Sequence, residues 1–495
     1  MSEKSTRVLR RPPVWLPPAL LTLAVTLTGL DSAQLWRDEL ATWSAATRSP
    51  GELARLAGTI DAATGPYYLL MHGWTTVAGD STVALRLPAV LAMAVAAGLL
   101  AVLGGWLVDR RCGLFAGLLF AVLPGTSRYG QEARPYALAT MLAVLATVLL
   151  VAALRRPSWA RWTGYAVAVT ALGLIHLIAL TLLVVHALVV VVTWWRGPAA
   201  AGVAAPAAPG AARDGRMWRW VVAVVPVAVL VGPLLIEART QRSRQLNWVH
   251  LARLDDLSAL PGGVTQSSVV GGLLVGVAGL GAARLGRRAL LPVSAVLLPV
   301  LLLFAVGAVV PLWVPRYLVF VVPFACLLAG AALAAVPARA ALVVVVLAGL
   351  LGLPDQAALR RTHEWPRTAP VDYAGAARVI AEGQRPGDGI VYSPRRSWLF
   401  LDLGIDYHLA DRPRDVLVTE DEDRRGDLWA AECPDPARCL TGAERVWLVL
   451  SGRHGEPLPA VPGKKGDALR EGFTVTQVWQ RPGLTVALLN RRSDR

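Results

Sequence analysis

The sequence predicts a polytopic α-helical membrane protein with a smaller α/β domain at its C-terminal end. Of the 495 residues, 55% are hydrophobic, and the apolar residues come in repeated runs of about the length that spans a bilayer. Residues 1–353 hold 28 Lys and Arg against 13 Asp and Glu, whereas residues 354–495 hold 21 of each. We therefore expect a transmembrane domain over residues 1–353 and a separate domain over residues 354–495.

About eleven apolar runs are expected to cross the membrane. Basic turns such as Arg110-Arg111 and Arg155-Arg156 fall on one side, which the positive-inside rule assigns to the cytoplasm together with the N-terminus. An odd number of spans then places the C-terminal domain outside the cytoplasm. The expected spans are 14–30, 83–107, 112–127, 136–154, 162–177, 178–195, 220–236, 267–283, 289–310, 317–336 and 340–353.

The exterior loop over residues 31–66 carries the first chemical signal. Asp38 and Glu39 follow the first span closely, and residues 39–47 and 51–60 are expected to form short helices along the membrane interface. A carboxylate held at the membrane interface can act as a general base on a hydroxyl group. The alternative is that the two acids only begin an interfacial helix, where they complement the helix dipole.

Further polar motifs lie at the exterior ends of later spans. They are Gly65-Pro66-Tyr67-Tyr68, Gln131-Glu132-Ala133-Arg134-Pro135-Tyr136 and Pro315-Arg316-Tyr317. Arginine suits a lipid phosphate because its guanidinium holds phosphate oxygens bidentately and stays protonated. Structural alternatives remain open: Arg134 pairs with Glu132 or Glu39, Arg316 extends to the interface, and the paired tyrosines anchor the second span.

This series of motifs resembles the bacterial family 39 type glycosyltransferases of the GT-C superfamily, which include protein O-mannosyltransferases and lipid A aminoarabinose transferases. The resemblance covers residues 31–140 well and the later spans loosely. It implies a GT-C transmembrane catalytic domain in a bacterial plasma membrane. Such an enzyme moves a sugar, here mannose by resemblance, from a polyprenyl phosphate to a hydroxyl of an extracytoplasmic acceptor, which is a cell-wall glycan, a glycolipid or a protein.

The resemblance also implies roles for individual residues. Asp38 matches the catalytic base, and Glu39 is expected to contact or orient the acceptor. The residues expected to bind substrate in the same cavity are Gln131, Glu132, Arg134, Tyr136, Tyr67, Tyr68, Arg316 and Tyr317. One departure is visible, since several related sequences carry a His shortly before the paired tyrosines, where this chain has Thr64-Gly65-Pro66.

A second basic group lies in the exterior loop over residues 237–263, against the positive-inside trend. It comprises Arg239, Arg242, Arg244 and Arg253, with His250. Either it binds an anionic lipid phosphate, with Arg242 and Arg244 as the contacts, or Asp255 and Asp256 neutralise it in a mobile loop.

Metals, cofactors and cysteines give few signals. Asp38 and Glu39 together offer carboxylate oxygens to a divalent cation, but no dense acidic cluster is present, so we expect no obligatory metal or cofactor. The arginine excess gives no argument for nucleic acid. Cys433 and Cys439 are spaced for a local disulfide in an oxidising exterior.

Two alternatives to a glycosyltransferase remain. A polytopic transporter or lipid flippase would place charges along a substrate path, although the chain shows no internal repeat and almost no acidic residue inside the spans. A non-catalytic cell-wall assembly subunit would instead depend on residues 354–495.

Overall fold

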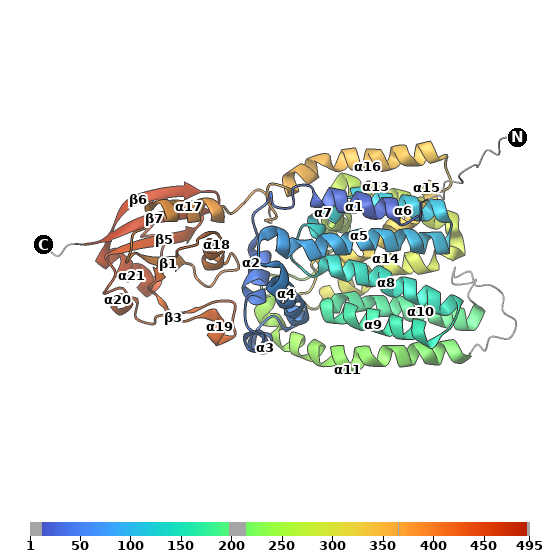
Figure 1. Cartoon of the computed structure of the whole chain (residues 1–495), viewed down its shortest axis with the longest axis horizontal. Helices are drawn as coiled ribbons and strands as arrows, with labels where there is room; N and C mark the ends of the chain where they lie inside the picture. Colours follow the sequence, from blue (N-terminus) through green and yellow to red (C-terminus); the bar gives the residue numbers. More distant parts are fainter. Residues whose placement is uncertain (1–11, 198–213, 365, 493–495) are drawn as a thin grey trace, which may run out of the picture.

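The computed structural model describes residues 12–197, 214–364 and 366–492. A long helical bundle and a smaller domain with a β-sheet are arranged end to end, with short helices at the junction between them (Figure 1). The expected fold class, a polytopic α-helical membrane protein with a C-terminal α/β domain, is confirmed.

The apolar helices of the bundle run along its long axis (Figure 1). In the described part of the chain, seven helical stretches are long and apolar enough to cross a membrane, and the longest of them, Ser268–Gly307, contains both α13 and α14. The bundle helices are α1 (Leu16–Leu27), α5 (Thr82–Leu107), α6 (Arg110–Val122), α8 (Tyr136–Arg155), α9 (Trp159–Ile175), α10 (Leu182–Arg196), α11 (Asp214–Gln245), α13 (Ser268–Leu285), α14 (Leu290–Gly307), α15 (Val322–Leu333) and α16 (Ala338–Leu359).

Every expected span overlaps one of these helices, but several boundaries differ. The helix α11 continues to Gln245, so Arg239, Arg242 and Arg244 lie on it and not in the exterior loop expected over residues 237–263. The expected span 112–127 joins two helices, because α6 ends at Val122 and α7 (Pro124–Gly130) begins after Leu123, which has the extended conformation that a following proline favours. In the other direction, α16 continues past Pro354, where we expected the domain boundary, to Leu359. A proline does not have to end an apolar helix, because neighbouring groups and small local adjustments can satisfy the backbone groups that it frees. The number of membrane crossings stays a prediction.

Glycine lets two of the bundle helices pack closely. A Cβ on Gly113 of α6 would lie 2.1 Å from the carbonyl oxygen of Ala101 on α5, and a Cβ on Gly104 would lie 2.6 Å from the Cα of Gly113. Small residues at such crossings are the usual means by which membrane helices approach each other, because burial of apolar surface gives little drive within lipid.

Short helices connect α1 to α5 and form the junction layer. They are α2 (Arg37–Ala46), α3 (Pro50–Thr59), η1 (Ala62–Thr64) and α4 (Gly65–Ala78). The first two coincide with the short helices expected in the loop over residues 31–66. Ser49 begins α3 with a capping box, since its side chain accepts from the backbone N–H of Glu52 and the Glu52 carboxylate accepts from the backbone N–H of Ser49.

Four shorter elements connect the bundle helices, and one of them, η4, joins α13 to α14 at the bundle end far from the C-terminal domain. They are η2 (Leu177–Thr181), α12 (Leu254–Thr265), η4 (Gly286–Ala289) and η5 (Pro315–Val321). The polar motifs therefore lie on separate elements, α2, the turn after α7 and η5, that meet at the junction.

The C-terminal domain is built on a five-stranded sheet in the order β2-β1-β5-β7-β6. Strand β1 is parallel to β2 and β5, whereas β7 is antiparallel to β5 and β6. The apolar run of β5 is buried throughout its centre, as expected for a strand covered on both faces. The strands are β1 (Gly389–Ser393), β2 (Arg414–Asp415), β3 (Val418–Glu420), β4 (Ala431–Glu432), β5 (Arg445–Ser451), β6 (Phe473–Arg481) and β7 (Leu484–Arg491).

Helices and one disulfide complete this domain. The helices are α17 (Tyr373–Gly383), α18 (Leu401–His408), α19 (Glu422–Arg425), α20 (Pro436–Cys439) and α21 (Gly463–Gly472). Strands β3 and β4 form a separate antiparallel pair. The sulfur atoms of Cys433 and Cys439, the pair expected from their spacing, are bonded to each other beside β4.

Polar contacts from several elements fix the domain on the bundle. The side chain of Gln34 donates to the carboxylate of Asp372 at 3.1 Å, at the start of α17. The hydroxyls of Tyr407 and Thr82 lie 3.0 Å apart, and the Tyr407 ring contacts Trp43 edge to face. Because these contacts join different elements, the C-terminal domain is held in one position over the junction helices.

Candidate active site

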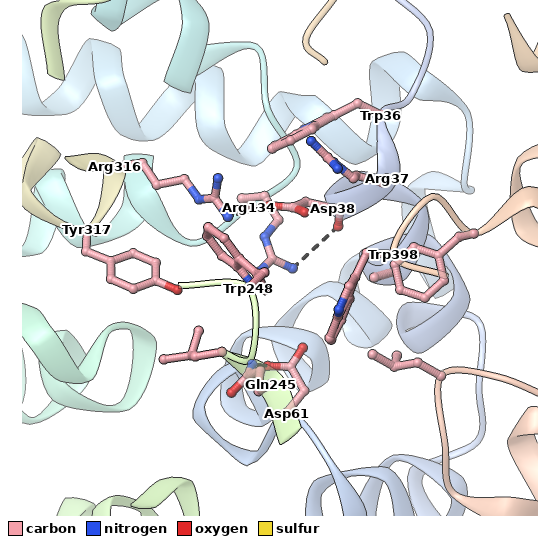
Figure 2. A pocket seen from close by; sticks show the side chains of 14 residues that line it. Trp36, Arg37, Asp38, Asp61, Arg134, Gln245, Trp248, Arg316, Tyr317 and Trp398 are labelled. Atoms are coloured by element: carbon pink, nitrogen blue, oxygen red, sulfur yellow. Dashed lines mark hydrogen bonds and ion pairs between the residues drawn. The ribbon is translucent and has the colours of Figure 1, made fainter. Parts of the chain in front are cut away.

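A cavity of about 220 Å³ lies between the bundle and the C-terminal domain (Figure 2). Its walls come from the first loop, the turn before α8, the end of α11, η5 and the C-terminal domain. We call it the junction cavity. It is lined by Trp36, Arg37, Asp38, Ala41, Asp61, Arg134, Gln245, Leu246, Trp248, Arg316, Tyr317, Trp398, Phe400 and Leu428.

Asp38 lies in the first turn of α2, and its side chain reaches into this cavity. Its Oδ2 atom is 3.2 Å from Nη2 of Arg316, which makes an ion pair between the first loop and η5. About a fifth of each side chain is exposed. The carboxylate is therefore both accessible from the cavity and held next to a cation.

Two indole rings and a phenol position Arg316. Its guanidinium carbon lies 5.7 Å from the ring centroid of Trp36 and 5.4 Å from that of Trp248, within the range of cation–π attraction. Its Nε donates to the hydroxyl of Tyr136 at 3.0 Å. The guanidinium is thus held in the cavity rather than extended to a membrane interface, which was the structural alternative for this residue.

Arg134 lies on the turn between α7 and α8 and faces Asp38 from another side (Figure 2). One of its Nη atoms donates to the backbone carbonyl of Asp38 at 3.4 Å and to the hydroxyl of Tyr68 at 3.2 Å. It makes no ion pair with Glu132 or Glu39, the alternative partners expected from the sequence. Both arginines of the expected pair therefore converge on Asp38.

A larger cavity of about 580 Å³ adjoins the first along η2 and α11. Its walls are mainly apolar, with Ile175, Ile178, Leu235 and Leu312 among them. The two cavities share four lining residues, which are Arg134, Gln245, Leu246 and Tyr317. We call the larger one the apolar cavity. An amphiphile with a polar head fits this arrangement, because the head can reach the arginines while the tail stays among apolar side chains.

Glu39, expected to contact the acceptor, does not line either cavity and is completely buried. It accepts from Nε and Nη2 of Arg86 at 2.8 and 2.7 Å and from the backbone N–H of Ala133 at 2.9 Å. The expectation was wrong because consecutive residues of an α-helix point about 100° apart. Asp38 faces the cavity, so Glu39 faces the protein interior.

Burial raises the pKa of Glu39, but the charge and hydrogen bonds of Arg86 outweigh this and hold the pKa far below its ordinary value. His363, whose Nδ1 is 3.6 Å from the Glu39 carboxylate, has its pKa lowered to about 3 by burial and by the nearby Arg128 charge. Arg86 also donates to the backbone carbonyls of Leu30 and Ala33. The buried pair of Arg86 and Glu39 therefore fixes the position of the loop that carries Asp38.

Gln131 and Glu132, also expected to line the cavity, are buried elsewhere. The Gln131 amide donates to the backbone carbonyls of Thr26 and Thr28 at the end of α1. Glu132 lies 2.9 Å from Nη1 of Arg128, one turn earlier along the chain. These residues support the turn that presents Arg134, and the expectation of substrate contact is corrected for both.

Asp61 is a cavity residue to which the sequence analysis gave no role. It is buried, has a left-handed backbone with φ of 64°, and accepts from the side chains of Tyr68, Thr64 and Gln245. Burial raises its pKa, with the Arg134 charge acting in the opposite direction. The sequence signal that could have identified Asp61 is its position four residues before Gly65 and the paired tyrosines.

The remaining expected residues divide between the cavities and the core. Tyr136 lines the apolar cavity, Tyr317 lines both cavities, and Arg242 lines the apolar cavity. Tyr68 bridges Asp61 and Arg134, and Tyr67 is buried beside it, but neither tyrosine lines either cavity. The expectation of substrate contact is therefore corrected for both, because their rings pack in the core and the Tyr68 hydroxyl is already bonded to Asp61 and Arg134.

Arg244 was expected to bind substrate but instead fastens the C-terminal domain. Its Nη2 lies 2.6 Å from the carboxylate of Asp427, a residue whose backbone carbonyl also accepts from Arg48. Asp427 is almost completely buried, so its charge needs these partners. The end of α11 thus holds a carboxylate of the C-terminal domain rather than a ligand.

We expect Arg244→Gln to loosen the C-terminal domain. Loss of a hydrogen bond to a charged group costs about 1.5–3 kcal/mol, so amide hydrogen exchange around residues 426–429 should accelerate about tenfold or more. Arg253→Gln is the control, because Arg253 is an exposed arginine of the neighbouring segment. Equal exchange in both variants would show that the Arg244–Asp427 pair does not hold the domain.

Among the described residues, no group of three or more His, Cys, Asp or Glu side chains is arranged to hold a metal ion. Asp38 and Glu39, the pair that could have shared a cation, face different directions, and Glu39 is already saturated by Arg86. The charged groups available at the junction cavity are therefore two carboxylates, Asp38 and Asp61, and a set of arginines.

Comparison with solved structures identifies the architecture as the GT-C fold. ArnT from Cupriavidus metallidurans in the apo state superposes with a TM-score of 0.62 at 13% identity, over 96% of this chain and 97% of that one. The same protein bound to undecaprenyl phosphate gives a TM-score of 0.58 at 14% identity, over 97% of this chain and 98% of that one. The C-terminal domain is thus included in the likeness.

One sequence family also matches part of the chain. Residues 65–205 match the family described as dolichyl-phosphate-mannose-protein mannosyltransferase, which covers the segment from α4 to α10. No curated protein matches the chain at a significant level.

Proposed function

We propose that this protein is a membrane glycosyltransferase that moves a sugar from a polyprenyl phosphate to a hydroxyl of an acceptor. The observation that carries the proposal is the meeting of the two cavities at Arg134 and Tyr317, with Asp38 and Arg316 directly beside that point. The apolar cavity suits the lipid, the arginines suit the phosphate, and the carboxylate suits the acceptor hydroxyl. The likeness to ArnT bound to undecaprenyl phosphate supports the same donor class.

The chemistry follows from these positions. Asp38 takes the proton of the acceptor hydroxyl, the oxygen attacks the anomeric carbon, and the bond from that carbon to the phosphate oxygen breaks. The phosphate leaves with the electron pair and is stabilised by Arg134 and Arg316, whose charges oppose the charge that grows on it. The result is inversion at the anomeric carbon, because attack and departure occur on opposite faces.

The ion pair between Asp38 and Arg316 implies that the donor binds before Asp38 acts as a base. A carboxylate in direct contact with a guanidinium is engaged by it, and a bound phosphate competes for the same guanidinium. Donor binding therefore draws Arg316 toward the phosphate and frees Asp38 for the acceptor. Trp36 and Trp248 keep Arg316 near both positions.

Mannose is the proposed sugar, supported by the family that residues 65–205 match. The proposed place is a bacterial plasma membrane with a cytoplasmic N-terminus. The junction cavity and the C-terminal domain then lie on the extracytoplasmic side, which agrees with the disulfide between Cys433 and Cys439. Asp38, Arg134 and Arg316 are the proposed reacting and phosphate-binding residues.

The donor class can be tested with purified protein in lipid. Labelled mannose supplied on polyprenyl phosphate should be transferred to a membrane or cell-wall extract, and the same sugar supplied as a nucleotide diphosphate sugar should not. Transfer from the nucleotide sugar alone would contradict the proposal, because the apolar cavity would then have no role in donor binding.

A variant that narrows the apolar cavity tests its role in donor binding. We expect Leu235→Trp to raise the KM for the polyprenyl donor about tenfold, because the larger side chain occupies space that the lipid needs. Leu230→Trp is a matched control on the same helix, since both leucines are about 55% exposed and only Leu235 lines the cavity. Equal KM values in the two variants would exclude the apolar cavity as the donor site.

A further inference from the structure

The C-terminal domain supplies one wall of the junction cavity. Trp398, Phe400 and Leu428 belong to that domain and line the cavity together with residues of the bundle. In Figure 2, Trp398 lies on the side of the cavity opposite Tyr317. Tyr317 also lines the apolar cavity, so the wall formed by the C-terminal domain lies on the side of the junction cavity away from the apolar cavity.

Trp398 is part of a rigid aromatic group. Its ring contacts Trp429 edge to face at 4.9 Å, and Trp429 in turn stacks on Phe400 at 5.6 Å with an angle of 13°. The indole N–H of Trp429 donates to the backbone carbonyl of Ser397 at 3.0 Å. The hydroxyl of Tyr373 donates to the backbone carbonyl of Leu399. The segment over residues 397–400 is therefore fixed from behind.

The backbone of this segment is held in a costly conformation. Phe400 has φ of 49°, in the left-handed region that bulky residues seldom adopt. Such a conformation persists only where the surrounding structure enforces it, and it is frequent at ligand-binding sites. Here it ends the segment and begins α18, which leaves Trp398 partly exposed at the cavity while Phe400 and Trp429 are buried.

The walls formed by the bundle carry hydrogen-bonding groups. Asp38, Asp61 and Gln245 line the cavity together with Arg316. An aromatic face and carboxylates within one cavity are complementary to a pyranose ring, whose C–H face is apolar and whose hydroxyls are polar. A cavity of about 220 Å³ is smaller than the ~300 Å³ at which sites for drug-sized ligands begin, so it has room for one acceptor ring while the donor approaches from the apolar cavity at Arg134 and Tyr317.

We propose that the acceptor is a glycan and that Trp398 is its platform, with one sugar ring of the acceptor packed on the indole and the attacking hydroxyl directed to Asp38. This inference rests on the proposed function for the direction of transfer, but the sugar-binding subsite is independent of it. It makes the C-terminal domain a determinant of acceptor specificity, and Trp398 a positioning residue rather than a catalytic one.

Kinetics of the full chain test the platform. Trp398→Ala should raise the KM for a glycan acceptor about tenfold and leave the KM for the polyprenyl donor unchanged, and Trp398→Phe should restore most of the loss. Trp479→Ala is the control, because Trp479 is a stacked tryptophan of the same domain that does not line the cavity. Unchanged acceptor KM in Trp398→Ala, or transfer to protein Ser or Thr only, would overturn the proposal.

Binding without turnover separates this proposal from the proposed function. Saturation-transfer NMR with methyl pyranosides of mannose, glucose and galactose should show contact of ring protons with wild type and with Trp479→Ala, and loss of that contact in Trp398→Ala. Contact that depends on Trp398 in a protein that transfers no sugar would support the glycan subsite and contradict the transferase. Absence of contact with wild type, or contact unaffected by Trp398→Ala, would overturn the subsite even if transfer occurs.

Discussion

Replacement of Asp38 by Asn is expected to lower the rate of sugar transfer about 100- to 10,000-fold, the range that general-base catalysis usually contributes. Asn keeps the shape of the side chain but cannot take a proton from the acceptor. The Asp38 side chain makes one ion pair, with Arg316, and lies partly exposed in the cavity, so the fold should survive the change. Thermal stability should be close to that of wild type.

Asp80→Asn is the matched control for this variant. Asp80 belongs to the same end of the bundle and accepts from the indole N–H of Trp43 at 2.9 Å, but it does not line the junction cavity. Its loss should leave transfer within a few-fold of wild type. Equal activity of Asp38→Asn and wild type would remove Asp38 from the mechanism.

Replacement of Arg86 by Met is expected to lower the free energy of unfolding more than any other substitution proposed for this protein. Arg86 and Glu39 are both completely buried, and removal of one partner leaves an uncompensated charge, which typically costs about 3–5 kcal/mol. The variant also loses the bonds from Arg86 to the carbonyls of Leu30 and Ala33, so the loop that carries Asp38 should become mobile. The melting temperature in detergent and the transfer rate should both fall.

Two further variants separate charge burial from lost packing. The double variant Arg86→Met with Glu39→Met removes both charges and should recover part of the stability that the single variant loses. Arg55→Met breaks the pair of Arg55 with Glu52, in which the Arg55 side chain is half exposed and the nitrogen–oxygen distance is 3.8 Å, and should cost no more than about 1 kcal/mol. Similar losses in Arg86→Met and Arg55→Met would contradict the structural role of the buried pair.

The same pair predicts a dependence of stability on acid. Because the pKa of Glu39 is depressed in the folded protein, the pair stabilises fully above the ordinary value of 4.5, and this contribution is lost as the pH falls below it toward the folded pKa. The melting temperature of wild type should therefore fall more steeply than that of Glu39→Gln between about pH 5 and pH 3. Parallel curves would show that Glu39 is not the charged partner of Arg86.

The helices were predictable because apolar runs of membrane length leave few other structures open to the chain. Short helices in the first loop followed from their pattern, and a separate C-terminal domain followed from the equal numbers of acidic and basic residues over 354–495. The sequence did not show that Leu123 separates α6 from α7 or that α16 continues past Pro354, because packing decides whether a proline ends a helix.

The site was predictable only in part. Asp38, Arg134, Tyr136, Arg316, Tyr317 and Arg242 line the two cavities, whereas Glu39, Gln131, Glu132, Tyr67 and Tyr68 are buried and line neither. Within a motif, neighbouring residues point in different directions, and the sequence does not state which face is buried. Asp61, Trp248 and Trp398 reach the cavity through tertiary contacts between distant segments, and Arg244 is occupied by Asp427 for the same reason.

The central claim is that a polyprenyl phosphate sugar is cleaved at the junction of the two cavities. Its most direct test supplies purified protein in proteoliposomes with a donor labelled both in the sugar and in the lipid, together with an acceptor extract. We predict one released polyprenyl phosphate for each sugar transferred, with both products lost in Asp38→Asn. Movement of the intact donor across the membrane, without release of polyprenyl phosphate, would contradict the claim and identify a flippase instead.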